Sequence, residues 1–132
     1  MKHIQVEELD LIGRDERGST FAIRNDRSGN YILCYRKAGT SSGRHYHSGK
    51  KPYKDPEILY LLSGTAEFRW YGPEEGPAAM QSRMLTAPVR VIIPIHVWHE
   101  LHAVTDCSFW EMNSLEDVQQ DSVRVEWKEE EK

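Results

Sequence analysis

Short strand-forming runs separated by turn residues follow one another along most of this chain of 132 residues. Seven runs are rich in β-branched and aromatic residues: 21–23, 31–35, 57–62, 66–71, 89–93, 99–104 and 108–112. Gly, Pro, Asp and Ser cluster between them, as at 26–30, 63–65 and 72–77, and such residues favour turns. Many short strands with frequent turns are typical of sandwiches and barrels. We therefore predict an all-β jelly-roll barrel, a double-stranded β-helix, with little helix.

One short helix is expected near the C-terminal end. Residues 115–120 follow Ser114, which is a good N-cap, and Asp117 stands three positions after Ser114. The length of the chain fits one domain, so residues 1–132 are interpreted as a single barrel with a core of about 20–113 and extensions at both ends. The segment 122–127 alternates apolar and polar residues and is expected to form a last strand, on the outside of the barrel or against a second subunit. The charged end 128–132 is expected to be solvated and frayed.

Composition excludes several classes of partner. The net charge is -4 with no basic stripe, which argues against nucleic-acid binding. There is no apolar run near eighteen residues and no apolar leader after Met1, so we expect a cytoplasmic protein without a membrane partner. Cys34 and Cys107 are too few for a disulfide framework and are expected to be reduced, buried thiols.

The side chains best suited to bind a metal lie around His45 and His47 in the sequence. Successive side chains of a strand point to opposite faces, so a His-x-His pair places both imidazoles on one side. Glu57 lies at the start of another predicted strand, and His99 follows an apolar run further along. Imidazole and carboxylate donors that converge from neighbouring strands form a site for a divalent transition metal.

The frame around these residues resembles the cupin family. Gly39, five residues, His45, Tyr46, His47, then Glu57, six residues and Gly64 is similar to the first cupin motif, and Pro94, four residues and His99 is similar to the end of the second. The resemblance covers about residues 31–113. It implies a small β-barrel, a homodimer, and a metal held by His45, His47, Glu57 and His99.

The chain departs from the family's pattern at several positions. The gap between His47 and Glu57 holds nine residues, 48–56, more than the pattern has. In the second motif, Pro88 and His96 stand where the pattern has Gly, and Ala103 stands where it often has Asn. Within the long gap, Lys50, Lys51 and Lys54 are expected to lie on a lid over the barrel mouth, where they would attract an anionic substrate. Tyr60 and His96 complete the candidate substrate-binding residues.

These observations leave several functions open. The first is a cupin with one divalent transition metal (Fe, Mn, Zn or Ni) that acts on a small anionic organic molecule, as a dioxygenase or an isomerase. The second is a non-catalytic module that binds or senses a small molecule through its metal. The third is a sugar-modifying isomerase or epimerase, which in a metal-free form needs a His-Asp pair in the barrel. No Asp stands beside a strand-borne histidine in this sequence, so this function ranks below the other two. The barrel alone cannot choose among them, because one fold hosts many functions.

Overall fold

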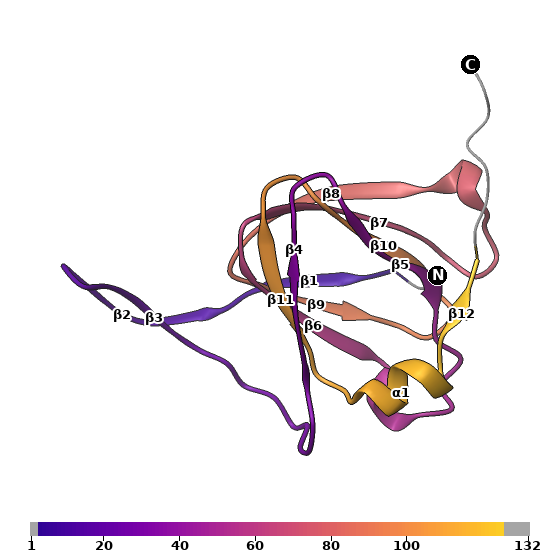
Figure 1. Ribbon diagram of the computed structural model, residues 1–132, viewed down its shortest axis with the longest axis horizontal. Coiled ribbons are helices and arrows are strands. Elements are labelled where there is room, and N and C mark those ends of the chain that lie inside the picture. Colours follow the sequence, from indigo (N-terminus) through magenta and orange to yellow (C-terminus); the bar gives the residue numbers. More distant parts are fainter. Residues whose placement is uncertain (1–2, 126–132) are drawn as a thin grey trace.

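The computed structural model describes residues 3–125, which form two antiparallel five-stranded sheets packed face to face (Figure 1). The first sheet contains, in spatial order, β1 (Gln5–Glu8), β9 (Val89–Ile93), β6 (Glu57–Ser63), β11 (Cys107–Glu111) and β4 (Ile32–Arg36). The second contains β12 (Val123–Arg124), β5 (Ser41–Tyr46), β10 (Trp98–Ala103), β7 (Thr65–Tyr71) and β8 (Gln81–Thr86). The prediction of an all-β jelly roll with little helix is confirmed.

The core lies between the sheets because apolar residues alternate along the central strands. In β7, Phe68 and Trp70 are buried on one face, as alternation predicts. They pack with inward residues of the facing sheet such as Leu61 and Val91 in one cluster of buried side chains. The two cysteines, Cys34 and Cys107, belong to the same cluster and are free, in agreement with the sequence interpretation.

The seven predicted runs do not include β1, β2 (Asp10–Asp15), β5 or β8, although the His-x-His pair that ends β5 was expected to lie in a strand. They lack the apolar run that marks the central strands, and β2 is exposed along its whole length. The expected last strand is β12, which pairs with β5 of the same chain, Val123 opposite Tyr46. The rest of that prediction, 126–127, and the expected frayed end, 128–132, lie outside the described residues.

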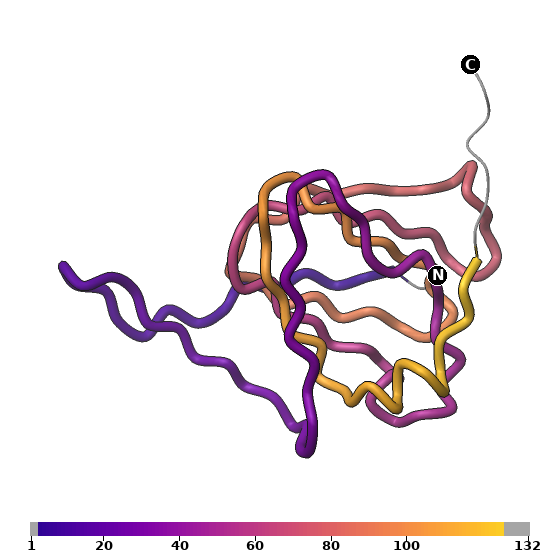
Figure 2. Tube along the Cα trace, viewed as in Figure 1, coloured from indigo at the N-terminus to yellow at the C-terminus, as the bar shows by residue number. Residues whose placement is uncertain are grey.

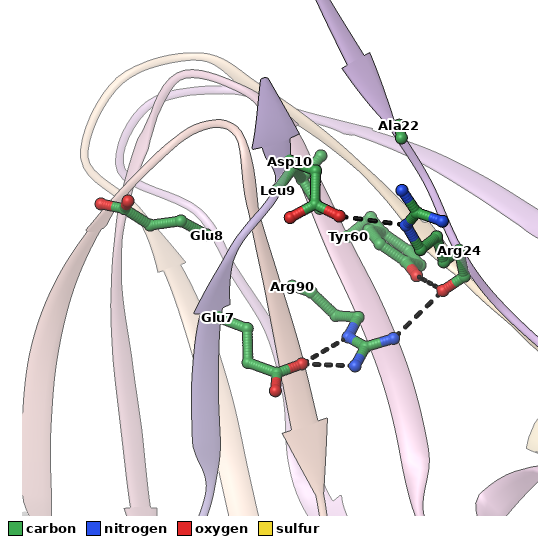
Figure 3. A pocket seen from close by; sticks show the side chains of 8 residues that line it. All are labelled: Glu7, Glu8, Leu9, Asp10, Ala22, Arg24, Tyr60 and Arg90. Carbon is green, nitrogen blue, oxygen red and sulfur yellow. Dashed lines mark hydrogen bonds and ion pairs between the residues drawn. The ribbon is translucent and has the colours of Figure 1, made fainter. Parts of the chain in front are cut away.

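A hairpin of β2 and β3 (Gly18–Ala22) projects from the barrel as an arm (Figures 1 and 2). A pocket of about 210 Å³ lies at its base (Figure 3). There Tyr60 donates a hydrogen bond of 3.0 Å to the carbonyl oxygen of Arg24, and Arg90 donates one of 3.1 Å to the same oxygen. Arg90 also pairs with Glu7, and Arg24 with Asp10. The base of the arm is therefore fixed to the outer face of the first sheet.

The helix that follows β11 lies at the lower right of the barrel in Figure 1. The helix α1 (Leu115–Gln120) has the predicted capping box, with Ser114 and Asp117 bonded to each other's backbone N–H groups. The turn η1 (Pro52–Lys54) precedes β6, and a second turn, η2 (Pro77–Ala79), precedes β8. Within residues 3–125, none of the helices has the length and apolar character needed to cross a membrane.

Candidate metal centre

Four side chains from three strand regions meet inside the barrel. His45 lies in β5 and His47 directly after it, Glu57 begins β6, and His99 lies in β10. One potential ligand atom from each lies within 4.8 Å of all the others. His47, Glu57 and His99 are buried, and His45 is partly buried. The structure thus brings together the four residues that the cupin resemblance implies.

A bulge in β5 aims the histidines inward. The pairing of β10 with β5 runs from Leu101 opposite Ser42 to His99 opposite His45, with Arg44 left as the extra residue. This extra residue switches the inward face from Ser42 to His45, so that His45 turns toward the barrel interior. Gly43, with φ +97°, fits the bulge, since a Cβ there would lie 2.8 Å from the carbonyl oxygen of His99.

Backbone carbonyls set the orientation of two imidazoles. His47 donates from Nδ1 to the carbonyl oxygen of Asp121 at 2.5 Å, and His99 donates from Nδ1 to that of Val97 at 3.0 Å. Each Nε2 therefore points at Oε2 of Glu57, at 2.8 Å for His47 and 3.2 Å for His99. In its neutral form, an imidazole held in this way presents a lone pair to a carboxylate that also has only lone pairs, so a proton or a metal cation is required between them. This donor set fits Fe, Mn, Zn or Ni.

The electrostatics of the site favour the metal-binding forms of His45 and Glu57. Burial, followed by the proximity of His99, lowers the pKa of His45 to about 2, so its imidazole is neutral at physiological pH. Burial acts to raise the pKa of Glu57, but Lys54 and His47 outweigh it and hold that pKa well below its usual range. Glu57 is therefore an ionised carboxylate.

A second carboxyl group faces the same interior. Glu111 lines a cavity of about 20 Å³ together with His45, Glu57 and His99. Burial, and then the charge of Glu57, raises the pKa of Glu111 to about 7. A cavity of this size holds an ion or about one water molecule. Sequence reasoning missed Glu111, although alternation from buried Phe109 places it on the inward face.

The candidate substrate-binding residues are distributed differently from the expectation. Lys54 is fully buried, and its Nζ lies 2.9 Å from Oε1 of Glu57. Lys50 is exposed, and Lys51 is partly buried with its Nζ 4.0 Å from Glu116. Of the three lysines, the structure brings only Lys54 to the ligand cluster.

Tyr60 and His96 lie outside the barrel interior. Tyr60 alternates with the inward Leu59 and points to the outer face, where it forms part of the pocket at the base of the arm (Figure 3). His96 is exposed with φ +67° in the turn before β10, at a position where the cupin pattern has Gly. Its ring lies 6.2 Å from that of Tyr46, and both line an outer pocket of about 220 Å³. Neither side chain faces the four candidate ligands.

The loop that was expected to be a lid is fixed by a residue that the sequence did not single out. The buried carboxylate of Asp121 accepts hydrogen bonds of 2.7–3.2 Å from Ser48, Gly49 and Lys51, three of them from backbone N–H groups. Burial acts to raise the pKa of Asp121, but these hydrogen bonds lower it below its usual range. Asp121 follows α1, far along the chain, and no motif in the sequence connects it to the histidines.

Comparisons with known proteins agree with this architecture. No family model matches the chain, and no curated protein matches it by sequence. Among solved structures, a 3,4-ketoisomerase from Thermoanaerobacterium thermosaccharolyticum in complex with TDP has a TM-score of 0.72 and 20% identity, with 95% of this chain and 89% of that chain covered. A 3,4-ketoisomerase from Helicobacter canadensis has a TM-score of 0.67 and 16% identity, with coverages of 92% and 90%. The dTDP-4-dehydrorhamnose 3,5-epimerase of Sulfolobus tokodaii has a TM-score of 0.63 and 13% identity, with coverages of 95% and 72%.

The chain therefore has the cupin-like jelly-roll fold of these solved structures. Identities of 13–20% show the fold alone.

Proposed function

We propose that this protein is a metal-dependent isomerase or epimerase that acts on a keto-sugar. The observation that carries the proposal is the convergence of three imidazoles and the carboxylate of Glu57 within 4.8 Å inside the barrel. The reaction class is suggested by the solved structures with the same fold, which are sugar ketoisomerases and epimerases. The metal and the sugar are thus supported by independent observations.

Different residues of this chain would hold the metal and transfer the proton. His45, His47, Glu57 and His99 would hold the ion, and a bound divalent metal supplies Lewis acidity that polarises a carbonyl oxygen. Isomerisation of a keto-sugar moves a proton away from the carbon beside the carbonyl and returns it elsewhere, which requires an acid–base group. Glu111 lines the same cavity and is the candidate for this role. Because the cavity is only about 20 Å³, a sugar requires side chains at the site to move on binding.

A second candidate is an isomerase that works without metal. The sequence offered no Asp beside a strand-borne histidine, but Nε2 of His47 lies 2.8 Å from Oε2 of Glu57, and both are buried. Because Nδ1 of this imidazole is bound to the carbonyl oxygen of Asp121, the pair would exchange protons through Nε2 and the carboxylate, with Glu57 stabilising the charged imidazole.

Deuterium uptake from solvent tests these proposals. The protein is purified, its metal content is measured, and it is incubated in D₂O with TDP-4-keto-6-deoxyglucose, which is bound by a variant of one neighbouring ketoisomerase. The main proposal expects uptake beside the carbonyl that stops when the metal is removed and returns when it is restored. Uptake that persists without metal and is lost in Glu57→Gln supports the second candidate. Binding without uptake supports a sensor, and oxygen consumption with a bound iron supports an oxygenase; either result contradicts the main proposal.

The homodimer implied by the cupin resemblance remains a prediction. Light scattering on the purified protein measures its mass directly, and a value near that of one 15.4 kDa chain would contradict it.

A further inference from the structure

A lysine is buried beside the candidate metal ligands. Lys54 has no exposed surface, which is rare for lysine unless its charge is paired. Its partner is Glu57, three residues further on, with Nζ 2.9 Å from Oε1. The ammonium group of Lys54 is therefore hydrogen-bonded to the carboxylate of Glu57, which is also a candidate metal ligand.

The two oxygens of Glu57 have separate partners. Oε2 faces the imidazoles of His47 and His99, where the metal is expected, and Oε1 faces Lys54. A divalent ion on Oε2 would place two cations on one buried carboxylate. Like charges repel more strongly in the interior than in water, because the effective dielectric constant is lower there. Lys54 therefore acts against metal binding while it neutralises Glu57 in the metal-free protein.

The position of Lys54 is fixed by the long segment between His47 and Glu57. The first part of this segment is bound to the carboxylate of Asp121, and Lys54 ends the turn η1, where its backbone N–H donates to the carbonyl oxygen of Lys51 at 2.9 Å. Lys54 itself has no exposed surface, so its ammonium group is enclosed by protein where it contacts Glu57. The gap 48–56, which is longer than in the cupin pattern, thus places the ammonium group of Lys54 at the site.

We propose that Lys54 is a tethered cation that neutralises Glu57 when the site is empty and competes electrostatically with the divalent metal. This inference rests on the metal site of the proposed function. It assigns Lys54 a positioning and regulating role: the lysine stabilises the metal-free site and weakens metal affinity, so that the site loads only when the metal is abundant.

The test compares Lys54→Met, which keeps the length of the side chain and removes its charge, with Lys54→Arg, which keeps a charge. Zinc affinity is measured at pH 8 by calorimetry with a competing chelator, and thermal unfolding is recorded with and without zinc. We expect Lys54→Met to bind zinc at least about tenfold more tightly than the parent, a difference of about 1.4 kcal/mol. In chelator it should unfold at a lower temperature than the parent, and zinc should raise its midpoint by more. Lys37→Met removes the same charge from an exposed side chain and should bind zinc like the parent.

Parental or weaker zinc affinity in a folded Lys54→Met overturns the inference. So does a metal-free Lys54→Met that is as stable as the parent. If Lys54→Met folds only with zinc, the competition is supported, and Lys54→Arg then supplies the affinity for the charged form. If no variant binds zinc, the competition is refuted, whereas deuterium uptake by metal-free protein still decides the proposed activity independently.

Discussion

His47 donates a hydrogen bond from Nδ1 to the backbone carbonyl oxygen of Asp121, 2.5 Å away and 74 residues further along the chain. The side chain of Asp121 simultaneously binds the loop that follows His47. Asp121, the residue immediately after α1, therefore orients a candidate ligand and fixes the segment that carries Lys54. Loss of a group that orients a metal ligand typically lowers metal affinity or activity by about 10- to 100-fold.

Asp121→Ala tests whether the side chain of Asp121 holds the loop that follows His47. The substitution leaves the backbone N–H groups of Ser48, Gly49 and Lys51 without their acceptor, which should lower the free energy of unfolding by about 3 kcal/mol. Urea denaturation measures the loss, and hydrogen exchange should show faster exchange in residues 48–51. Asp26→Ala removes an exposed carboxylate and serves as the control. Unchanged exchange in the loop would show that Asp121 does not hold it.

The strands and the ligands differ in how far the sequence predicts them. Central strands such as β6 and β9 carry runs of apolar residues that only a buried strand explains, and they were predicted. The arm strand β2 and the edge strand β8 are mostly exposed, so burial left no pattern in their sequences. The capped helix α1 was predicted because its signal is local.

The candidate ligands followed from spacing and resemblance, but their environment did not. The bulge at Arg44, which turns His45 inward, depends on pairing with β10 and cannot be deduced from β5 alone. Lys54 was expected at a solvent-exposed mouth, because lysine usually lies at the surface. Its burial follows from the ionised carboxylate of Glu57, whose own burial requires a compensating charge.

Metal occupancy should depend on pH. Protons compete with the metal for imidazole, so occupancy should fall as the pH drops below the usual histidine value of about 6.5, with tight binding moving the loss lower. His47→Ala should reduce metal affinity at least about tenfold, because it removes a ligand. Metal content after dialysis at pH 4–8 measures both effects, with His102→Ala as the control, since His102 bonds Ser41 outside the barrel interior. Full occupancy at pH 4 would contradict a site dominated by histidine.

Glu111 should give the metal-free protein a distinctive pH dependence of stability. Its pKa is raised to about 7 in the folded state, so the folded protein holds more protons than the unfolded chain between about pH 4.5 and 7. Stability attributable to this group therefore falls as the pH rises through that window, by at most about 3 kcal/mol. Glu111→Gln removes the ionisation and should be more stable than the parent at pH 8 but not at pH 4.

Four neighbouring groups contribute to the electrostatic environment of Glu111, namely Glu57, Lys54, His47 and Arg36. Urea denaturation in chelator at both pH values isolates the contribution of Glu111, because these neighbours are the same in parent and variant. Glu74→Gln, at an exposed position, should show no such difference between the two pH values. A Glu111→Gln variant that is no more stable than the parent at pH 8 would indicate that Glu111 already ionises without cost.

Gly43→Ala should damage the site through the backbone alone. The residue has φ +97°, and an added Cβ would lie 2.8 Å from the carbonyl oxygen of His99, so the bulge must shift or β5 must separate from β10. The strain should cost about 1–3 kcal/mol of stability. Because the bulge aims His45, zinc affinity should also fall, although no ligand has been removed. Gly13→Ala is the matched control, since its Cβ would meet no atom within 4 Å and its φ is not in the left-handed region. Zinc affinity and urea denaturation of both variants decide the question: equal zinc affinity in Gly43→Ala and the parent would mean that the bulge does not set the position of His45.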